Sequence, residues 1–236
     1  MWRIGIKSWA DFISRFGTSP YHQGMCAQIQ ESIDALNDKN GEYFSQKMPK
    51  NEMWRCFPHF EKVAYLDIET TGLGNTNDHV TVVGIYDGKE VKSYIHEQNI
   101  DQMLEDIKTF DSIVTFNGSL FDIPFLKRSY PSIKIPAVQI DLRFVLSSID
   151  VRGGLKKIEQ QFGFEREDDL KGLNGYDAVL LWRKYRRDND KEALDKLVRY
   201  KAADISNLKK LMEWAYIQKR SRCGIDESLI NTNADN

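Results

Sequence analysis

The sequence predicts an α/β protein in which a mixed five-stranded sheet is flanked by helices and preceded by a helical N-terminal extension. Two observations support this fold class. Short runs of β-branched and aromatic residues alternate with helical patterns in the middle of the chain, and both flanking regions show helical periodicity alone. The chain has 236 residues, 41% hydrophobic and 29% charged, which suits one sizeable soluble domain with an appendage.

Residues 1–60 are predicted to form the helical N-terminal extension. A short helix is expected through "WADFISRF", beginning at Ser8 or Asp11. A second helix is expected over residues 21–36, where apolar residues recur in steps of three and four. The stretch "NDKNGEYF" then predicts a break.

From residue 63 onward the pattern changes to strands and helices. Tight turns join the first three strands, with Asp87-Gly88 as the clearest hairpin signal. Strands are predicted at 63–68, 79–86, 90–96, 112–116 and 136–140, and helices at 99–109, 119–128, 154–162, 174–187 and 190–218. Residues 220–236 form a polar tail that is expected to fray.

Composition narrows the functional classes. The net charge of −2 gives no global basic field, although a local groove can be basic on a neutral protein. The three cysteines are scattered, which argues against a disulfide framework or a zinc site and fits a reducing cytosol. No apolar run approaches the roughly 18 residues of a membrane span, and Asp11 interrupts any signal peptide. A cytoplasmic protein without a membrane partner is therefore expected.

Two acidic residues lie in a predicted strand whose other residues are typical of a hydrophobic core. In "KVAYLDIETTGLG", Asp67 and Glu69 are two positions apart, and side chains alternate across a strand, so both point to one face. Neighbouring carboxylates repel each other and are costly to desolvate. The pair therefore requires a functional reason.

Two further acids lie at the margin of apolar elements. Asp122, in "NGSLFDIPFLKR", is either a helix N-cap or a group held at a site. Asp204 follows Tyr200 by four residues at the edge of a helical apolar face, where a solvated surface acid is the alternative. If the four acids converge beside the sheet, they need compensating positive charge. Two Mg²⁺ or Mn²⁺ ions, which suit phosphodiester chemistry, would supply it.

These motifs resemble a known family. "DIE" at 67–69, "NGSLFD" at 117–122 and "YKAAD" at 200–204 are similar to the three exonuclease motifs of the DEDD 3′–5′ exonucleases, which have a ribonuclease-H-like fold. The tyrosine four positions before the last Asp indicates the tyrosine subclass. The histidine subclass has His five positions before it, where this chain has Arg199.

A closer resemblance covers most of the chain. "GIKSWADF", "EMWRCF", "YLDIETTGL", "VTFNGSLFDIPFL", "IDLR", "GGLKKIE" and "YKAADISNL" are similar to the YprB-type predicted exonucleases, ribonuclease-H-like proteins related to the proofreading domain of family B DNA polymerases. The resemblance implies an exonuclease domain over residues 61–219. Gln139 departs from it, since that family tends to carry His before "IDL".

The resemblance also implies roles for individual residues. Asp67, Glu69 and Asp204 would hold the more buried metal ion, and Asp67 and Asp122 would reach the second. Tyr200 would orient the attacking water. The candidates for contact with the end of the nucleic-acid strand are Thr70, Thr71, Leu73, Asn117 and Phe121.

Other charged segments can be interpreted either as nucleic-acid contacts or as ordinary structural features. "WRKYRR" at 182–187 is either a nucleic-acid patch or a helix C-terminus that complements its dipole. Lys156 and Lys157 are comparable candidates for backbone contacts, and "EREDDLKG" at 165–172 is expected to be a solvated loop.

The expected function is thus a metal-dependent 3′–5′ exonuclease that acts on single-stranded DNA or RNA ends by a two-metal mechanism. Two rivals remain: a structure-specific endonuclease on the same fold, and an inactive nucleic-acid-binding scaffold whose acids do not converge. The sequence leaves open the choice of DNA or RNA and the partner, if any, of the N-terminal extension.

Overall fold

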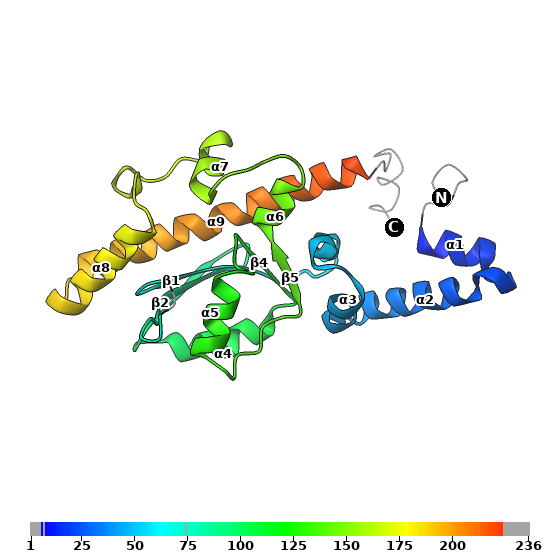
Figure 1. Cartoon of the computed structure of the whole chain (residues 1–236), viewed down its shortest axis with the longest axis horizontal. Helices are drawn as coiled ribbons and strands as arrows, with labels where there is room; N and C mark the ends of the chain where they lie inside the picture. The colour runs from blue at the N-terminus through cyan, green and yellow to red at the C-terminus, as the bar shows by residue number, and fades with distance from the viewer. Residues whose placement is uncertain (1–5, 7, 74, 224–236) are drawn as a thin grey trace.

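The computed structural model describes residue 6, residues 8–73 and residues 75–223. Five strands form one sheet in the order β3-β2-β1-β4-β5 (Figure 1). Their bounds are β1 Val63–Thr70, β2 Val80–Tyr86, β3 Val91–Ile95, β4 Ser112–Thr115 and β5 Val138–Asp141. β1, β2 and β3 pair antiparallel, whereas β4 and β5 run parallel to β1. The predicted mixed five-stranded sheet is confirmed.

Helices precede, interrupt and follow the sheet. The N-terminal ones are α1 Trp9–Phe16, α2 Gln23–Asn37, α3 Gly41–Lys47 and the 3₁₀ segment η3 Lys50–Cys56. The central ones are α4 Ile100–Asp106, α5 Asp122–Ser129 and α6 Leu142–Ser147, and the last are α7 Leu155–Gln161, α8 Gly175–Asp188 and α9 Lys191–Arg222. Short 3₁₀ turns lie at Pro20–His22, Ile107–Thr109 and Asp168–Leu170.

Two helices were not predicted, because each begins at a polar residue that looks like a break. Asn40 is the N-cap of α3, where its side-chain oxygen accepts a hydrogen bond from the Tyr43 backbone N–H at 3.1 Å. Asp141 caps α6 in the same way, through the Arg143 N–H at 3.1 Å. Polar residues that end one element also start the next.

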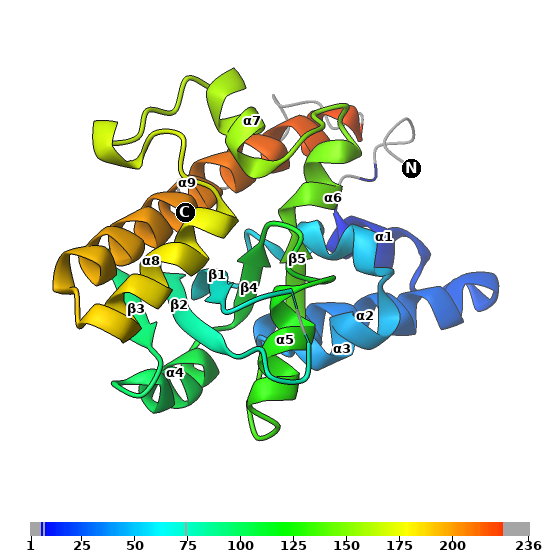
Figure 2. The ribbon, with the colours of Figure 1, turned by 60° about the vertical axis from the view of Figure 1, so that its left-hand side comes forward.

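The alternation of β1 decides which side chains meet which helices. Val63 and Tyr65 share one hydrophobic cluster with residues of α9, and Ala64 and Leu66 share another with residues of α4 and α5. The sheet is therefore a layer between α9 on one face and α4 and α5 on the other (Figures 1 and 2). Because Asp67 continues the odd-numbered row, the predicted acid pair faces α9.

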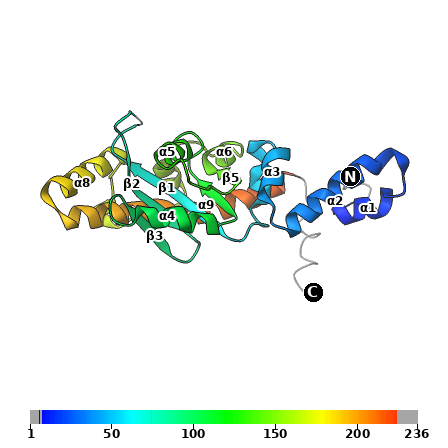
Figure 3. The same ribbon diagram turned by 90° about the horizontal axis from the view of Figure 1, so that it is seen from below.

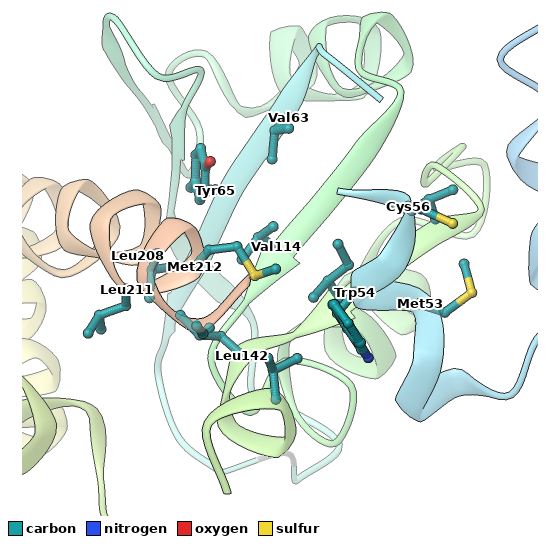
Figure 4. Close-up of a cluster of buried hydrophobic side chains, with 14 of the residues drawn as sticks. Met53, Trp54, Cys56, Val63, Tyr65, Val114, Leu142, Leu208, Leu211 and Met212 are labelled. Atoms are coloured by element: carbon teal, nitrogen blue, oxygen red, sulfur yellow. The ribbon is translucent and has the colours of Figure 1, made fainter. Parts of the chain in front are cut away.

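The N-terminal extension is joined to the sheet by buried aromatic residues. Trp54 of η3 is 2% exposed and packs on Tyr216 of α9, with ring centroids 5.8 Å apart. Trp54 and Met53 belong to the same hydrophobic cluster as the sheet residue Val114 and the α9 residue Met212, all of which are labelled in Figure 4. In contrast, α1 and α2 project away from the sheet (Figure 3). The extension thus has an anchored half and a projecting half.

The last helix runs beyond its predicted end. α9 continues to Arg222, four residues past the expected 218. Residues 220–222 are therefore helical, and the rest of the predicted frayed tail, from 224, lies outside the described residues. Within the part of the chain that the structure describes, no helix is both long enough and apolar enough to cross a membrane.

Candidate active site

Three of the predicted acids converge between β1 and α9. Asp67 and Glu69 extend from β1 toward α9, and Asp204 extends from α9 with only 6% of its surface exposed. One carboxylate oxygen from each of the three lies within 4.8 Å of the others. The interpretation of Asp204 as a solvated surface acid is wrong.

Asp122 joins this group from the start of α5. The N-cap position belongs to Phe121, which makes no side-chain cap hydrogen bond, so Asp122 is not the N-cap. Instead, its buried carboxylate accepts a hydrogen bond from the Ile68 backbone N–H at 3.0 Å. That N–H lies between Asp67 and Glu69, so the fourth acid is tied to the strand that carries the first two.

Burial raises the pKa of three of the acids, Glu69, Asp122 and Asp204. Desolvation raises the pKa of Glu69 to about 7, with Lys201 opposing the rise and the Asp67 charge adding to it. Desolvation, reinforced by the Asp67 charge, raises the pKa of Asp122 well above its usual range. Desolvation also raises the pKa of Asp204. Like charges in a dry site are unfavourable, so the cluster favours any cation that can enter it.

A lysine that the sequence analysis did not anticipate lies among the acids. The Lys201 side chain is 1% exposed, and its ammonium pairs with Asp67 and, at 2.7 Å, with Glu69 Oε1. It also donates to the Ile68 carbonyl at 3.3 Å. The spacing was a usable signal, because a residue three positions before Asp204 on a helix lies on the same side.

Arg166 supplies a second cation. Its guanidinium lies 2.5 Å from Asp204 Oδ1 and also pairs with Glu159, which is itself buried. Asn207 of α9 donates to the other Glu159 oxygen at 2.9 Å. The expectation that 165–172 is a solvated loop is therefore wrong at Arg166, whose side chain is 10% exposed and reaches back to the acids. Leu170 is buried as well.

Tyr200 is buried one helical turn from Asp204. The Lys156 ammonium lies 4.7 Å from its ring centroid, and the Arg166 guanidinium 5.7 Å. Burial, together with the Asp204 and Glu69 charges, raises the pKa of Tyr200 far above its ordinary value. Its hydroxyl therefore stays protonated and can donate a hydrogen bond.

The segment after β1 forms a turn held by its own polar groups. The Thr70 hydroxyl donates to the Gly72 carbonyl at 2.5 Å, so it serves the turn. Thr71 Oγ1 accepts from the His79 backbone N–H at 3.0 Å, and the Thr71 hydroxyl lies 3.4 Å from Asp78. Leu73, in contrast, is 91% exposed. Of these predicted substrate residues, Leu73 offers the most open surface.

Asn117 lies at the end of β4 with a positive φ of 66°. Its N–H donates to Asp141 at 2.8 Å and its side-chain oxygen accepts from Arg143 at 2.5 Å. Phe121 is half-buried and packs on Phe125, with ring centroids 5.5 Å apart. Both predicted substrate residues are thus fixed in position by neighbours.

Gln139 lies on β5, where its side-chain amide donates to the Pro136 carbonyl at 3.1 Å. This polar contact is local to its own segment, between residues three positions apart. It gives the Gln139 side chain a structural partner.

Two cavities border predicted substrate residues, and both carry arginines. One, of about 560 Å³, is lined by Thr71, His79, His96, Glu97, Trp182, Arg183, Arg186 and Arg187. The other, of about 520 Å³, is lined by Phe116, Asn117, Arg143, Ser147, Val151, Arg152, Gly153 and Gly154. Three arginines of the "WRKYRR" segment thus line the same cavity as Thr71, and two of them, Arg186 and Arg187, also lie in the last turn of α8.

The donor set of the acid cluster fits a hard divalent cation. Carboxylate oxygens are the ligands that Mg²⁺ and Mn²⁺ favour, and three of them come within 4.8 Å of one another. Asp67, Glu69 and Asp204 would hold such an ion, and Asp122 and Asp67 stand together beside it.

Comparisons with known proteins agree with this architecture. Residues 64–216, well over half of the chain, match the family model of the RNase_H superfamily. The chain belongs to the RNase_H superfamily. No curated protein matches the sequence.

Several solved structures resemble this chain at low sequence identity. The family B DNA polymerase from the archaeon Pyrobaculum calidifontis matches with a TM-score of 0.50 at 19% identity, over 64% of this chain and 24% of the polymerase. Brucella melitensis NrnC matches with a TM-score of 0.49 at 19% identity, over 71% and 78% of the two chains. The Aedes aegypti Nibbler EXO domain gives 0.40 at 14%, over 75% and 88%. This chain spans about a quarter of the polymerase's length, and the likeness is one of fold.

Proposed function

We propose that this RNase_H superfamily member is a metal-dependent 3′–5′ exonuclease of the DEDD tyrosine subclass, close to the YprB-type proteins, that hydrolyses single-stranded DNA or RNA ends. The observation that carries the proposal is the convergence of Asp67, Glu69 and Asp204, each largely buried, with ligand oxygens within 4.8 Å. Burying several carboxylates close together lowers the stability of a fold, so their presence is best explained by a function such as metal binding. The motif order and the family support the same conclusion.

The acids would bind the reaction's cofactor, two Mg²⁺ or Mn²⁺ ions. Asp67, Glu69 and Asp204 hold the more buried ion in this proposal, and Asp67 and Asp122 reach the second. Bound divalent cations lower the pKa of a water and stabilise the charge on the leaving oxygen of a phosphodiester. Asp122 adds rigidity, because its hydrogen bond to the Ile68 N–H fixes it relative to the strand.

Other residues position water and substrate. The protonated Tyr200 hydroxyl orients the attacking water, and Arg166 holds the Asp204 carboxylate in place at 2.5 Å. Leu73 meets the terminal base from the exposed turn, and Thr71 binds near the strand end at the mouth of one arginine-lined cavity. Asn117 borders the other cavity. Arginines in both cavities suit the phosphate backbone of a single strand.

The test is nucleotide release from a 5′-labelled single strand in the presence of Mn²⁺. Wild type should shorten the strand stepwise from its 3′ end, and Asp67→Asn should lower the rate by at least about a thousandfold, because it removes a ligand shared by both ions. Asp101→Asn, at an exposed position of α4, is the matched control and should retain full activity.

A circular single strand separates the rival functions. An exonuclease leaves the circle intact, whereas an endonuclease opens it. Equal nucleotide release by wild type and Asp67→Asn would contradict the proposal and favour an inactive binding scaffold.

A further inference from the structure

Lys201 lies among the acids of the site, yet the proposed function gives it no role. Its ammonium bonds to Asp67, to Glu69 Oε1 at 2.7 Å and to the Ile68 carbonyl at 3.3 Å. Asp67 and Glu69 are also two of the three acids whose ligand oxygens converge. The ammonium therefore engages the same carboxylates that would coordinate the more buried cation.

The packing against β2 leaves space for the Lys201 side chain. Gly84 of β2 pairs with Asp67, and a Cβ atom at Gly84 would come within 2.8 Å of Lys201 Cγ. A glycine inside a strand weakens the strand, so a close approach by another group usually explains it. Here the lysine stem fills the space above the glycine and carries the charge to the acids.

The balance of charge at the site also accounts for a lysine at this position. Asp67, Glu69, Asp122 and Asp204 bring four carboxyl groups together, and Arg166 pairs with only one of them, Asp204. Lys201 is the cation between the two acids of β1. A buried carboxylate pair without a cation is costly, so the Lys201 ammonium lowers the cost of holding Asp67 and Glu69 together, as a bound divalent ion also would.

An ammonium and a divalent cation cannot share the same oxygens. Mg²⁺ approaches its oxygen ligands to about 2.0–2.1 Å, which leaves no room for a nitrogen donating to those atoms, and the two positive charges repel. We propose that Lys201 is a built-in competitor for the more buried cation position, so that the side chain must leave before a divalent ion occupies that position. The inference rests on the proposed function, whose metal ligands it uses.

The competition predicts a gain of metal affinity when the lysine charge is removed. In calorimetric titrations of the full chain with MnCl₂, Lys201→Met should bind Mn²⁺ at least about tenfold more tightly than wild type, because a repelling charge in a buried site is gone. Lys209→Met is the matched control. Lys209 lies two turns further along α9, donates to the Gly88 carbonyl at 3.2 Å and makes none of the acid contacts described for Lys201. Its Mn²⁺ affinity should equal that of wild type.

Thermal unfolding gives a second readout that does not depend on activity. In EDTA, Lys201→Met should unfold at a lower temperature than wild type, and Mn²⁺ should raise its midpoint by more than it raises that of wild type. Lys201→Gln, which keeps N–H donors without the charge, should behave in the same way and serves if the Met variant does not fold.

The outcomes separate this inference from the proposed function. If wild type binds Mn²⁺ and both Lys201 variants bind it equally or more weakly, the lysine is only a structural ion-pair partner and the inference is overturned, while the metal site stands. If neither wild type nor any variant binds Mn²⁺, the metal site and the inference both fail.

Discussion

At the scale of single residues, the site consists of ionisable groups whose properties follow from burial. Asp67 and Glu69 share a face because strand side chains alternate, and Asp204 meets them because α9 covers that face. The resulting desolvation changes which protonation states are available near neutral pH. Two predictions follow from these changes.

Metal affinity should depend on pH through Glu69. Its pKa of about 7, raised by burial, means that a proton occupies the carboxylate at pH 6 and is mostly gone at pH 8. A divalent cation binds the ionised form, so Mn²⁺ affinity should rise by about tenfold from pH 6 to pH 8 and level off above. Titration calorimetry at three pH values measures this rise. Glu69→Gln should bind weakly with a flatter pH dependence, and an affinity of wild type that stays constant across the range would contradict the assignment.

The Tyr200 hydroxyl should matter for catalysis and not for folding. Tyr200→Phe keeps the buried ring and its contacts with Lys156 and Arg166, but it loses the group that would orient water. Nucleotide release should fall by about ten- to a hundredfold, the range expected for lost positioning, with an unchanged unfolding midpoint. Full activity of this variant would remove Tyr200 from the mechanism.

At the scale of elements, the loop between α7 and α8 is held to α9 by ion pairs of two kinds. Arg166 pairs with Glu159 and Asp204, whose side chains are 2% and 8% exposed. Arg199 pairs with Glu167 and Asp169 at the surface, where water competes. The same loop therefore offers a buried pair and an exposed pair for comparison.

Arg166→Met should destabilise the protein by about 3–5 kcal/mol, because it leaves two buried carboxylates without their cation. Denaturant unfolding in EDTA measures this loss. Arg199→Met, the control, should cause a much smaller change that fades in high salt. Equal effects of the two substitutions would show that the Arg166 pair is no more protected from solvent than the surface pair.

The elements also show what the sequence could and could not predict. All five strands were predictable because β-branched residues and tight turns mark them locally. α3 and α6 were missed because they are short and their caps, Asn40 and Asp141, look like breaks. The four acids were found through motif spacing. Lys201 was missed although its spacing of three from Asp204 places both residues on the same side of a helix. Arg166 was missed because no short pattern encodes the path of the loop that carries it to the acids.

At the scale of the whole molecule, the N-terminal extension and the RNase_H domain share a hydrophobic core. Phe44, Trp54 and Phe60 are all buried in the cluster that includes Val114 of β4 and Met212 of α9. The projecting helices α1 and α2 contribute only Ala35 to the buried part of this cluster. A domain boundary at residue 60 therefore agrees with the sequence motifs but divides a single hydrophobic cluster.

Two truncations test this organisation. Removal of residues 1–37 should leave a folded, metal-binding protein, because α3 and η3 remain. Removal of residues 1–60 should prevent cooperative folding, since the loss of a buried Trp or Phe alone costs about 3–5 kcal/mol. Calorimetric unfolding of the two truncated proteins measures the difference. A cooperative transition in the shorter protein would show that residues 61–236 fold on their own.

The separation of the site residues along the chain bears on the order of synthesis. Lys201 and Asp67 are 134 positions apart, so the acids of β1 leave the ribosome long before the helix that carries their counter-charge. Contacts this distant in sequence form late, because the entropy of closing the intervening chain must be overcome first. Until α9 docks, the mutual repulsion of Asp67 and Glu69 keeps that face of the sheet hydrated. A chain that lacks α9 therefore has neither a closed core nor the three converging carboxylates of Asp67, Glu69 and Asp204.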